Sequence, residues 1–254
     1  MSYIGNYLTV KEVDILIDTM PKISKLHTTR AAIPVNVLQL LLKIIYHGML
    51  RVEEAVNLRK SDIDFKNDDI ILRETQTGWT KCECHGSDKN CLKCGGKGKH
   101  QVPEIALFSS PSLWQEIREY VRDLKPDQNL FESKHTNEPL NRQNVWDYLK
   151  TAAEIAKLKK NVDVKSLRDS RAHHLRITGL LRESEINQLY RGDKSLISGA
   201  YVPTPSDVLK RKELQANEFL LTFCEDCDYK NPEDAIFCCR CGHPVTQNKK
   251  IIQK

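Results

Sequence analysis

The cysteines constrain this 254-residue chain more than any other residue type, because all nine lie in two short clusters, within residues 82–94 and 224–241. Disulfide frameworks belong mainly to secreted chains, whereas clustered thiols in a reducing compartment are typical of metal sites. Residues 1–14 show no basic stretch followed by an apolar core and a cleavage site, so we expect no signal peptide. The clusters therefore predict bound metal.

The second cluster has the spacing of a zinc ribbon. Two Cys-x-x-Cys knuckles separated by ten residues let four thiolates converge on one Zn²⁺, namely Cys224, Cys227, Cys238 and Cys241. Gly242 suits the tight turn after the second knuckle, whereas Asp228 stands where a glycine often follows the first. We expect Cys239 to be a bystander. So short a ribbon cannot bury a core, so metal must supply its fold. Its role, DNA contact or protein contact, is open.

The first cluster offers four thiolates within thirteen residues but with uneven knuckles: Cys82, Cys84, Cys91 and Cys94. His85 is an alternative ligand to one of them. We expect a second zinc ion here, because four exposed free thiols on one loop would be prone to oxidation. Unliganded cysteines are the alternative.

The apolar pattern predicts a mainly α-helical fold with a small antiparallel β-sheet. Thr9 and Glu12 form the capping box of a first helix over 9–20. An almost wholly apolar helix over 35–46 suits a buried position. Further helices are expected after Arg51 and over 113–124, 142–158, 167–175, 183–189 and 207–221, with strands at 70–72 and 101–108. The strands would carry the first cysteine cluster at a hairpin tip.

Length and charge bound the remaining possibilities. We expect a main domain over 1–217, with a zinc-binding insertion at about 80–100, and a ribbon with a basic tail over 218–254. The net charge of +5 supports nucleic-acid binding only weakly, and solvated helix faces are the alternative interpretation. No apolar run approaches the ~20 residues of a bilayer span, so we expect a cytoplasmic protein without membrane contact.

Two segments each place an arginine beside the start of a predicted helix. Residues 44–64 (IIYHGMLRVEEAVNLRKSDID) hold a Gly-x-x-Arg turn with Arg51, followed by a helix that carries Glu54. Residues 164–179 (VKSLRDSRAHHLRITG) hold a Lys-x-x-Arg pattern that leads into a helix, with Lys165, Arg168, Ser170, Ala172 and His174. Two guanidiniums suit a phosphodiester, because each offers a rigid bidentate fork to phosphate oxygens.

A third segment, residues 189–207 (LYRGDKSLISGAYVPTPSD), carries Gly192, Ser195, Leu196 and Tyr201. In this order the three segments resemble the signatures of the tyrosine recombinase (phage integrase) family, and the resemblance covers residues 9–217. The second segment has Lys165 where the family usually has histidine. In this respect the chain resembles archaeal or archaeal-virus integrases with a C-terminal zinc ribbon. The resemblance implies the tyrosine recombinase catalytic fold.

The resemblance also implies a site-specific DNA recombinase or integrase that works through a covalent 3′-phosphotyrosyl intermediate. Tyr201 is then the nucleophile, Arg51 and Arg168 stabilise charge on the phosphate, and Lys165 contacts it. The phosphotyrosyl link conserves bond energy, so no nucleotide cofactor is needed. The partners implied are double-stranded DNA and other copies of the chain, as a tetramer on DNA, which would place the protein at the nucleoid.

In this family a lysine in a β-hairpin usually donates the proton to the leaving 5′ oxygen. Residues 95–107 (GGKGKHQVPEIAL) resemble that hairpin, which points to Lys97. Lys81 and Lys99 are alternatives, because the cysteine insertion makes the register ambiguous.

Departures from the family pattern keep other functions open. Asp193, or Lys194 after a one-residue shift, stands where the third signature has His or Trp, and an aspartate there would repel the phosphate. We do not expect the helical clamp domain that usually precedes the catalytic domain. The alternative is a catalytically impaired accessory DNA-binding protein that retains the fold, and a strand-nicking, topoisomerase-like relaxase is a third. We expect His174 to be a packed core histidine.

Overall fold

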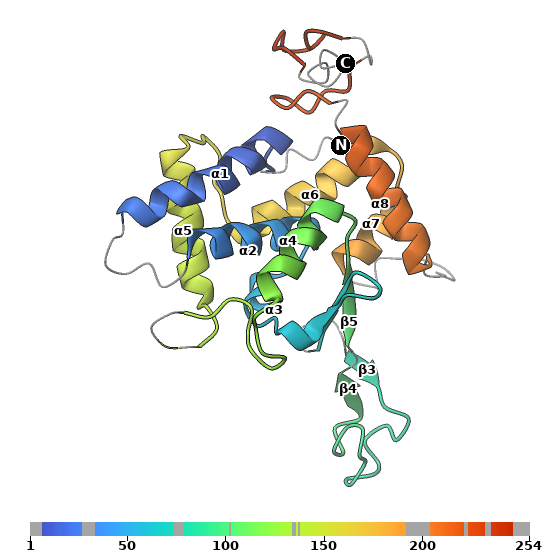
Figure 1. Ribbon diagram of the computed structural model, residues 1–254. Helices are drawn as coiled ribbons and strands as arrows, with labels where there is room; N and C mark the ends of the chain where they lie inside the picture. The colour runs from blue at the N-terminus through green and yellow to red at the C-terminus, as the bar shows by residue number, and fades with distance from the viewer. Residues whose placement is uncertain are drawn as a thin grey trace.

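The computed structural model describes residues 7–26, 34–73, 79–101, 103–133, 136, 138–191, 204–220, 223–231 and 235–245. A body of helices carries a projecting two-stranded arm on one side and the C-terminal cysteine-rich segment on the opposite side (Figure 1). The helices are α1 (Val10–Leu26), α2 (Val35–His47), α3 (Val52–Val56), α4 (Pro111–Val121), α5 (Arg142–Ile155), α6 (Val164–Thr178), α7 (Glu183–Tyr190) and α8 (Ser206–Leu220). A 3₁₀ turn, η1 (Lys60–Asp62), precedes the strands β1 (Ile63–Asp64), β2 (Asp69–Leu72), β3 (Trp79–Lys81), β4 (Lys99–Gln101) and β5 (Glu104–Leu107). The predicted mainly helical class is confirmed.

The start of α1 matches its predicted capping box, but the helix is longer than predicted. The amide of Thr9 donates to Glu12 Oε2 at 2.8 Å, and the amide of Glu12 donates to Thr9 Oγ1 at 3.2 Å. The helix then continues past Pro21, which has no N–H to donate to the carbonyl of Ile17. Gln39 on α2 replaces that donor, because its Nε2 lies 3.1 Å from Ile17 O. A contact from another helix thus lets α1 continue through a proline.

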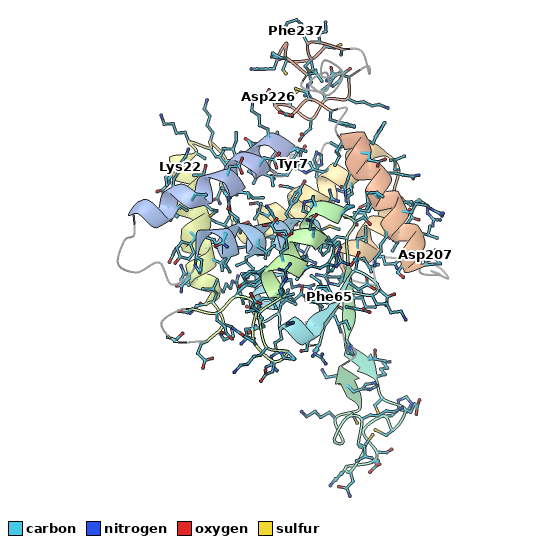
Figure 2. The ribbon with its side chains drawn as sticks, viewed as in Figure 1. Tyr7, Lys22, Phe65, Asp207, Asp226 and Phe237 are labelled. Carbon is cyan, nitrogen blue, oxygen red and sulfur yellow. The ribbon has the colours of Figure 1, made fainter. Side chains whose placement is uncertain are left out.

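α2 forms the centre of the main core, as its apolar sequence predicted. It contacts α1, α3, α4 and α6, and its side chains at Leu41, Leu42, Ile44 and Ile45 are fully buried. Side chains fill the space between these helices (Figure 2). Although α2 is strongly apolar, it has only 13 residues. Among the described residues, no helix combines the length and apolarity needed to cross a bilayer.

The strands form two antiparallel sheets, whereas the sequence predicted a single partner strand over 101–108. In the first sheet β2 pairs with both β1 and β5, and in the second β3 pairs with β4 so that Lys81 lies opposite Lys99. Pro103 separates the two ladders, and a proline cannot donate to a ladder. The β3–β4 arm extends away from the helices with the first cysteine cluster at its tip, as predicted (Figure 1).

A buried ion pair fixes α8 against α6. Nη2 of Arg171 donates to Glu213 Oε1 at 2.6 Å and to Asn217 Oδ1 at 2.7 Å, and both charged side chains are 1% exposed or less. The amide of Ser109 donates to the second carboxylate oxygen of Glu213 at 2.9 Å. Removing one member of such a pair costs about 3–5 kcal/mol, because the other charge stays buried. The ion pair and its hydrogen bonds therefore fix α8 on the helical body.

Candidate active site and metal centres

Arg51 lies at the turn between α2 and α3, directly before the first residue of α3. Its backbone N–H donates to Glu54 Oε2 at 2.8 Å, which satisfies an amide at the start of the helix. Its Nη1 donates to Glu54 Oε1 at 2.6 Å, so a single carboxylate holds both the backbone and the guanidinium. The Glu54 side chain is 4% exposed and that of Arg51 is 20% exposed. The guanidinium therefore stays accessible while its base is fixed.

Arg168 projects from α6 toward the same turn. Its Nε donates to Met49 O at 2.7 Å, and its Nη2 donates to the carbonyl of Tyr190, the last residue of α7. The guanidinium carbon also lies 3.7 Å from the centroid of the Tyr190 ring. Burial, reinforced by the nearby cations Arg191 and Arg51, lowers the pKa of Arg168 to about 10. The side chain therefore remains a cation at neutral pH, fixed by three elements of the fold.

Arg191 is a third arginine at this place, and the sequence analysis missed it. It ends α7 in the left-handed conformation at φ 51°, and its side chain is 4% exposed. Nη2 donates to Glu54 Oε2 at 2.8 Å and to Met49 O at 2.9 Å, and Nη1 donates to Gly48 O at 3.1 Å. Burial lowers the pKa of Arg191, although Glu54 opposes the shift. Arg191 thus locks the carboxylate that in turn holds Arg51.

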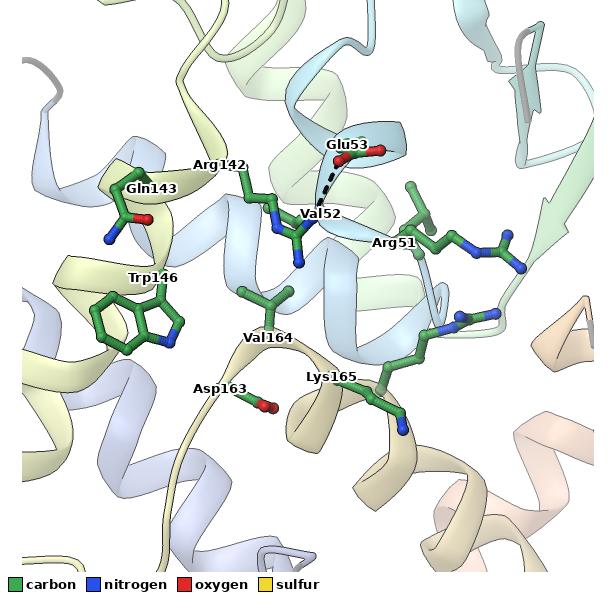
Figure 3. A pocket seen from close by; sticks show the side chains of 11 residues that line it. Arg51, Val52, Glu53, Arg142, Gln143, Trp146, Asp163, Val164 and Lys165 are labelled. Atoms are coloured by element: carbon green, nitrogen blue, oxygen red, sulfur yellow. Dashed lines mark hydrogen bonds and ion pairs between the residues drawn. The ribbon is translucent and has the colours of Figure 1, made fainter. Parts of the chain in front are cut away.

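A cavity of about 580 Å³ opens beside these arginines. Cations from three elements of the fold, Arg51, Arg142 and Lys165 among them, surround the cavity (Figure 3). Its lining comprises Leu50, Arg51, Val52, Glu53, Arg142, Gln143, Trp146, Asp163, Val164, Lys165 and Arg168. Lys165 is exposed on the first turn of α6. Glu53 accepts from Arg142 Nη1 at 3.3 Å along one wall, whereas Asp163 is used as the N-cap of α6. The remaining cations make the cavity suited to an anion such as a phosphate.

Tyr201, Asp193 and Lys194 lie outside the described residues, as do Gly192 and Ser195 of the same signature. The described chain stops at Arg191 and resumes at Thr204. Thr204 is held against α7, because its amide donates to Gln188 Oε1 at 3.0 Å and its carbonyl accepts from Gln188 Nε2 at 2.9 Å. Both ends of the segment that contains Tyr201 are therefore attached to the helix that ends at the arginines.

Tyr190 is the tyrosine that the described residues place against Arg168. Its hydroxyl donates to Asp169 Oδ1 at 2.5 Å. Burial and this hydrogen bond raise the pKa of Tyr190 to about 12, despite the nearby guanidinium of Arg168. A phenol that resists ionisation and is already bound to a carboxylate is a poor nucleophile. The arrangement makes Tyr190 a support for Arg168.

The three hairpin lysines lie on the β3–β4 arm and do not line the arginine cavity. Lys81 and Lys99 oppose each other at the end of the ladder. Lys97 lies inside the cysteine loop, where its amide donates to Cys94 O at 3.1 Å. In contrast, Lys165 does line the cavity. The assignment of Lys97 as the proton donor stays a prediction.

Each predicted cysteine cluster brings four sulfur atoms together. Within each cluster the four Sγ atoms lie within 4.8 Å of one another. In the first cluster the Cys82–Cys91 and Cys84–Cys94 pairs are 3.6 and 3.3 Å apart, and in the second the Cys224–Cys241 and Cys227–Cys238 pairs are 3.5 and 3.7 Å apart. A tetrahedral Zn²⁺ with Zn–S bonds of ~2.3 Å needs sulfurs about 3.8 Å apart. Both donor sets therefore fit one zinc ion each.

The neighbours of the sulfur ligands include two further candidate ligands and two turn residues. Cys239 is exposed and stays outside the ligand set, and His85 likewise does not join the first set. Gly242 has φ 73°, as a tight turn after the second knuckle requires. Asp228 takes the matching place after the first knuckle and has φ 53°, a conformation that costs an aspartate more than a glycine.

Comparisons with known proteins identify the family. The sequence model of the phage integrase family matches residues 6–183, about seven tenths of the chain. A putative integrase/recombinase, y4qK, of Sinorhizobium fredii is 28% identical over 161 residues, which are 63% of this chain and 44% of that protein. Tyrosine recombinase XerD of Corynebacterium glutamicum is 28% identical over 179 residues, which are 68% of this chain and 49% of that protein. The chain thus spans about half the length of these relatives. The predicted resemblance to archaeal integrases stays a prediction.

Solved structures show the same fold. The XerH site-specific recombinase bound to its difH substrate superposes with a TM-score of 0.52 and 16% identity, over 75% of this chain and 48% of that one. The Tn1549 transposon integrase in complex with circular intermediate DNA has a TM-score of 0.50 and 13% identity, over 84% of this chain and 64% of that one. The matched sequence includes Arg51, Lys165 and Arg168. The chain therefore belongs to the phage integrase family of tyrosine recombinases.

Proposed function

We propose that the protein is a site-specific DNA recombinase or integrase that cuts and rejoins double-stranded DNA through a covalent 3′-phosphotyrosyl intermediate. The observation that carries the proposal is the convergence of Arg51 and Arg168 on one cationic cavity, each fixed by backbone or carboxylate contacts. Fixed donors stabilise developing charge without reorganising during the reaction. The two guanidiniums bind the non-bridging oxygens of the scissile phosphate, and Lys165 contributes a third cation.

Tyr201 supplies the nucleophile in this proposal. Tyr201 lies three positions before Thr204, so chain geometry limits the distance between their Cα atoms to about 11 Å. Thr204 is bound to Gln188 on α7, and the last residues of that helix contact Arg168. The Tyr201 oxygen forms a bond to phosphorus, the phenol proton is lost to solvent or a neighbouring base, and the bond from phosphorus to the 5′ oxygen breaks. A second strand's hydroxyl reverses these steps without ATP.

The leaving 5′ oxygen must gain a proton, and two locations offer a lysine. We assign the role of proton donor to Lys97, with Lys81 and Lys99 as alternatives on the same arm. The arm lies outside the cavity, so this assignment requires DNA to bridge the arm and the helical body (Figure 1). Lys165 already lines the cavity. A substrate with sulfur at the 5′-bridging position distinguishes them, because a thiolate leaves without a proton and rescues only variants of the proton donor.

Zinc has a structural place in this proposal. One ion in each cluster would hold the arm through Cys82, Cys84, Cys91 and Cys94 and the ribbon through Cys224, Cys227, Cys238 and Cys241. Such sites supply folding free energy to segments that are too small to bury a core. Residues 1–217 would form the catalytic domain with the arm inserted at about 80–100, and 218–254 the ribbon and tail. We further propose a homotetramer on DNA, located in the cytoplasm at the nucleoid.

Covalent capture tests the proposal without knowledge of the target sequence. The protein is incubated with a pool of nicked duplexes of random sequence, in which cleavage releases a short strand and traps the enzyme on DNA. We expect an adduct that survives denaturation, and sequencing of the captured strand identifies the target. Retained duplex binding without any adduct would instead favour the accessory DNA-binding protein. Religation of the captured strand to a second duplex separates a recombinase from a relaxase.

A further inference from the structure

The ribbon makes specific contacts with the helical body. Its first knuckle lies beside the start of α1, where Lys11 Nζ and Asp226 Oδ1 are 2.7 Å apart. Figure 2 labels Asp226 at the edge of the ribbon that faces the helices. The side chains of this pair are 42% and 25% exposed, so the pair alone contributes little stability. The neighbouring Asp228 makes contacts of another kind.

Asp228 inserts its carboxylate into the junction between α1 and α6. Its Oδ1 accepts from the amide of Val10, the first residue of α1, at 3.3 Å, and its Oδ2 lies 3.6 Å from Nε2 of His174 on α6. The Asp228 side chain is 8% exposed and that of His174 is fully buried. An acceptor at a helix N-terminus satisfies an otherwise unpaired amide and favours the helix dipole. The carboxylate thus accepts a hydrogen bond at the start of α1 and lies beside a buried side chain of α6, a helix far away in sequence.

His174, predicted as a packed core histidine, is the buried end of this contact. Its Nδ1 lies 2.6 Å from the hydroxyl of Tyr46 on α2, and its Nε2 lies 2.9 Å from Leu8 O. The amide of Leu8 in turn donates to Ser170 Oγ on α6 at 2.7 Å. The segment before α1 is therefore attached to α6 at two points, and Asp228 covers that attachment from the ribbon side. α6 is also the helix that carries Arg168.

The backbone of Asp228 supports a docking role. Its φ of 53° is unfavourable for a residue with a side chain, by about 1 kcal/mol, whereas the second knuckle uses Gly242 at φ 73° in the matching place. Glycine would remove the strain at the first knuckle, but it would also remove the carboxylate. The amide of Asp228 donates to Cys224 O at 2.8 Å, so the knuckle that holds the sulfurs also sets the direction of the carboxylate.

We infer that the ribbon is a docking module whose metal-bound first knuckle uses Asp228 to clamp the start of α1 onto α6. The surface it binds is formed by the amide end of α1, Lys11 and His174, and its occupant is the ribbon of the same chain. The inference rests on zinc in the ribbon, which is part of the proposed function, and is independent of strand-cleavage chemistry. Loss of that zinc then loosens the helix that carries Arg168, although no cysteine lies in the cavity.

Hydrogen–deuterium exchange on the full chain tests the clamp without DNA. We compare Asp228→Gly, which relieves the backbone and removes the carboxylate, with Asp228→Asn, which keeps an oxygen acceptor for the amide of Val10. With zinc content unchanged, we expect Asp228→Gly to speed exchange over 10–14 and 170–178 roughly fivefold, equivalent to about 1 kcal/mol. Asp228→Asn should stay closer to wild type. Unchanged exchange in both segments in a fully zinc-loaded Asp228→Gly protein would overturn the inference.

Removal of ribbon zinc supplies a second test that does not depend on how Asp228 variants fold. Cys224→Ser should lose one zinc and show the same faster exchange in α1 and α6. Cys82→Ser is the matched control, because it removes zinc from the arm, far from both helices (Figure 1). If Cys224→Ser loses its zinc while α1 and α6 exchange as in wild type, the ribbon is only tethered to the body. Because neither readout uses catalysis, failure of covalent DNA capture would leave this result intact.

Discussion

Exchange of Glu54 for glutamine tests the arginine network, with the adjacent Glu53 as its control. Glu54 accepts from the amide and Nη1 of Arg51 and from Nη2 of Arg191, and both Glu54 and Arg191 side chains are 4% exposed. Glu53 instead forms a 3.3 Å pair with Arg142, in which the side chains are 52% and 71% exposed. The two exchanges are chemically identical and differ only in what surrounds the carboxylate.

The expected magnitudes follow from that difference. Breaking a buried pair costs about 3–5 kcal/mol, but Arg191 keeps its backbone acceptors at Gly48 and Met49, so we expect about 2–4 kcal/mol for Glu54→Gln. At roughly 2–4 °C per kcal/mol for a domain of this size, the melting temperature should fall by roughly 4–16 °C. Glu53→Gln should change stability by less than about 1 kcal/mol. Equal losses for the two variants would refute the network.

The stability difference between wild type and Glu54→Gln should also depend on pH, in a direction set by the pKa of Glu54. Burial alone would raise the pKa of Glu54, but Arg191 and Arg51 hold it below its ordinary value of 4.5. A carboxylate with a depressed pKa contributes stability that is fully present above the unfolded-state pKa and is lost as the pH falls through the folded-state value. The gap between wild type and Glu54→Gln should therefore be full at pH 7 and shrink below about pH 4. Denaturant unfolding at both pH values measures it, and a gap that widens in acid would contradict the assignment.

Three further predictions concern the site and the metals. Arg51→Ala and Arg168→Ala should each reduce the rate of covalent DNA capture by about 10²–10³-fold, measured in single-turnover time courses with binding checked separately. A 5′-bridging-sulfur substrate should restore capture by Lys97→Ala, and rescue of Lys165→Ala instead would move the proton donor into the cavity. Elemental analysis should return two zinc ions per chain in wild type and in Cys239→Ser, whereas a single ion in wild type would contradict one of the two sites.

Local sequence patterns predicted the elements whose stability is local. The capping box of Thr9 and Glu12 and the buried α2 follow from residues a few positions apart, and both are confirmed. The convergence of each cysteine set also follows from short spacing, because the short loop between the two pairs of cysteines allows few conformations. The features that sequence reasoning missed instead depend on distant partners. α1 passes Pro21 because Gln39 on another helix supplies the missing donor.

The residues of the candidate site likewise divide into those that local patterns indicated and those that only the structure revealed. Arg51 and Arg168 were found because each stands in a recognisable local pattern, and the structure brings them to one cavity. Arg191 precedes the glycine of the third segment and was overlooked, because its contact with Glu54 spans 137 positions of sequence. Asp228 was noticed only as a departure from glycine, since its contacts with α1 and α6 cannot be inferred from its neighbours.

Mass spectrometry of the residue that is bonded to DNA distinguishes Tyr201 from every other nucleophile. The protein captured on nicked DNA is digested with nuclease and protease, and mass spectrometry locates the remaining nucleotide. We expect a phosphotyrosyl link at Tyr201 and no adduct from Tyr201→Phe at unchanged DNA binding. The adduct should persist in Tyr190→Phe, because the Tyr190 hydroxyl is bound to Asp169 in the wild type. A link at Tyr190, or an undiminished adduct from Tyr201→Phe, would contradict the assignment of the nucleophile.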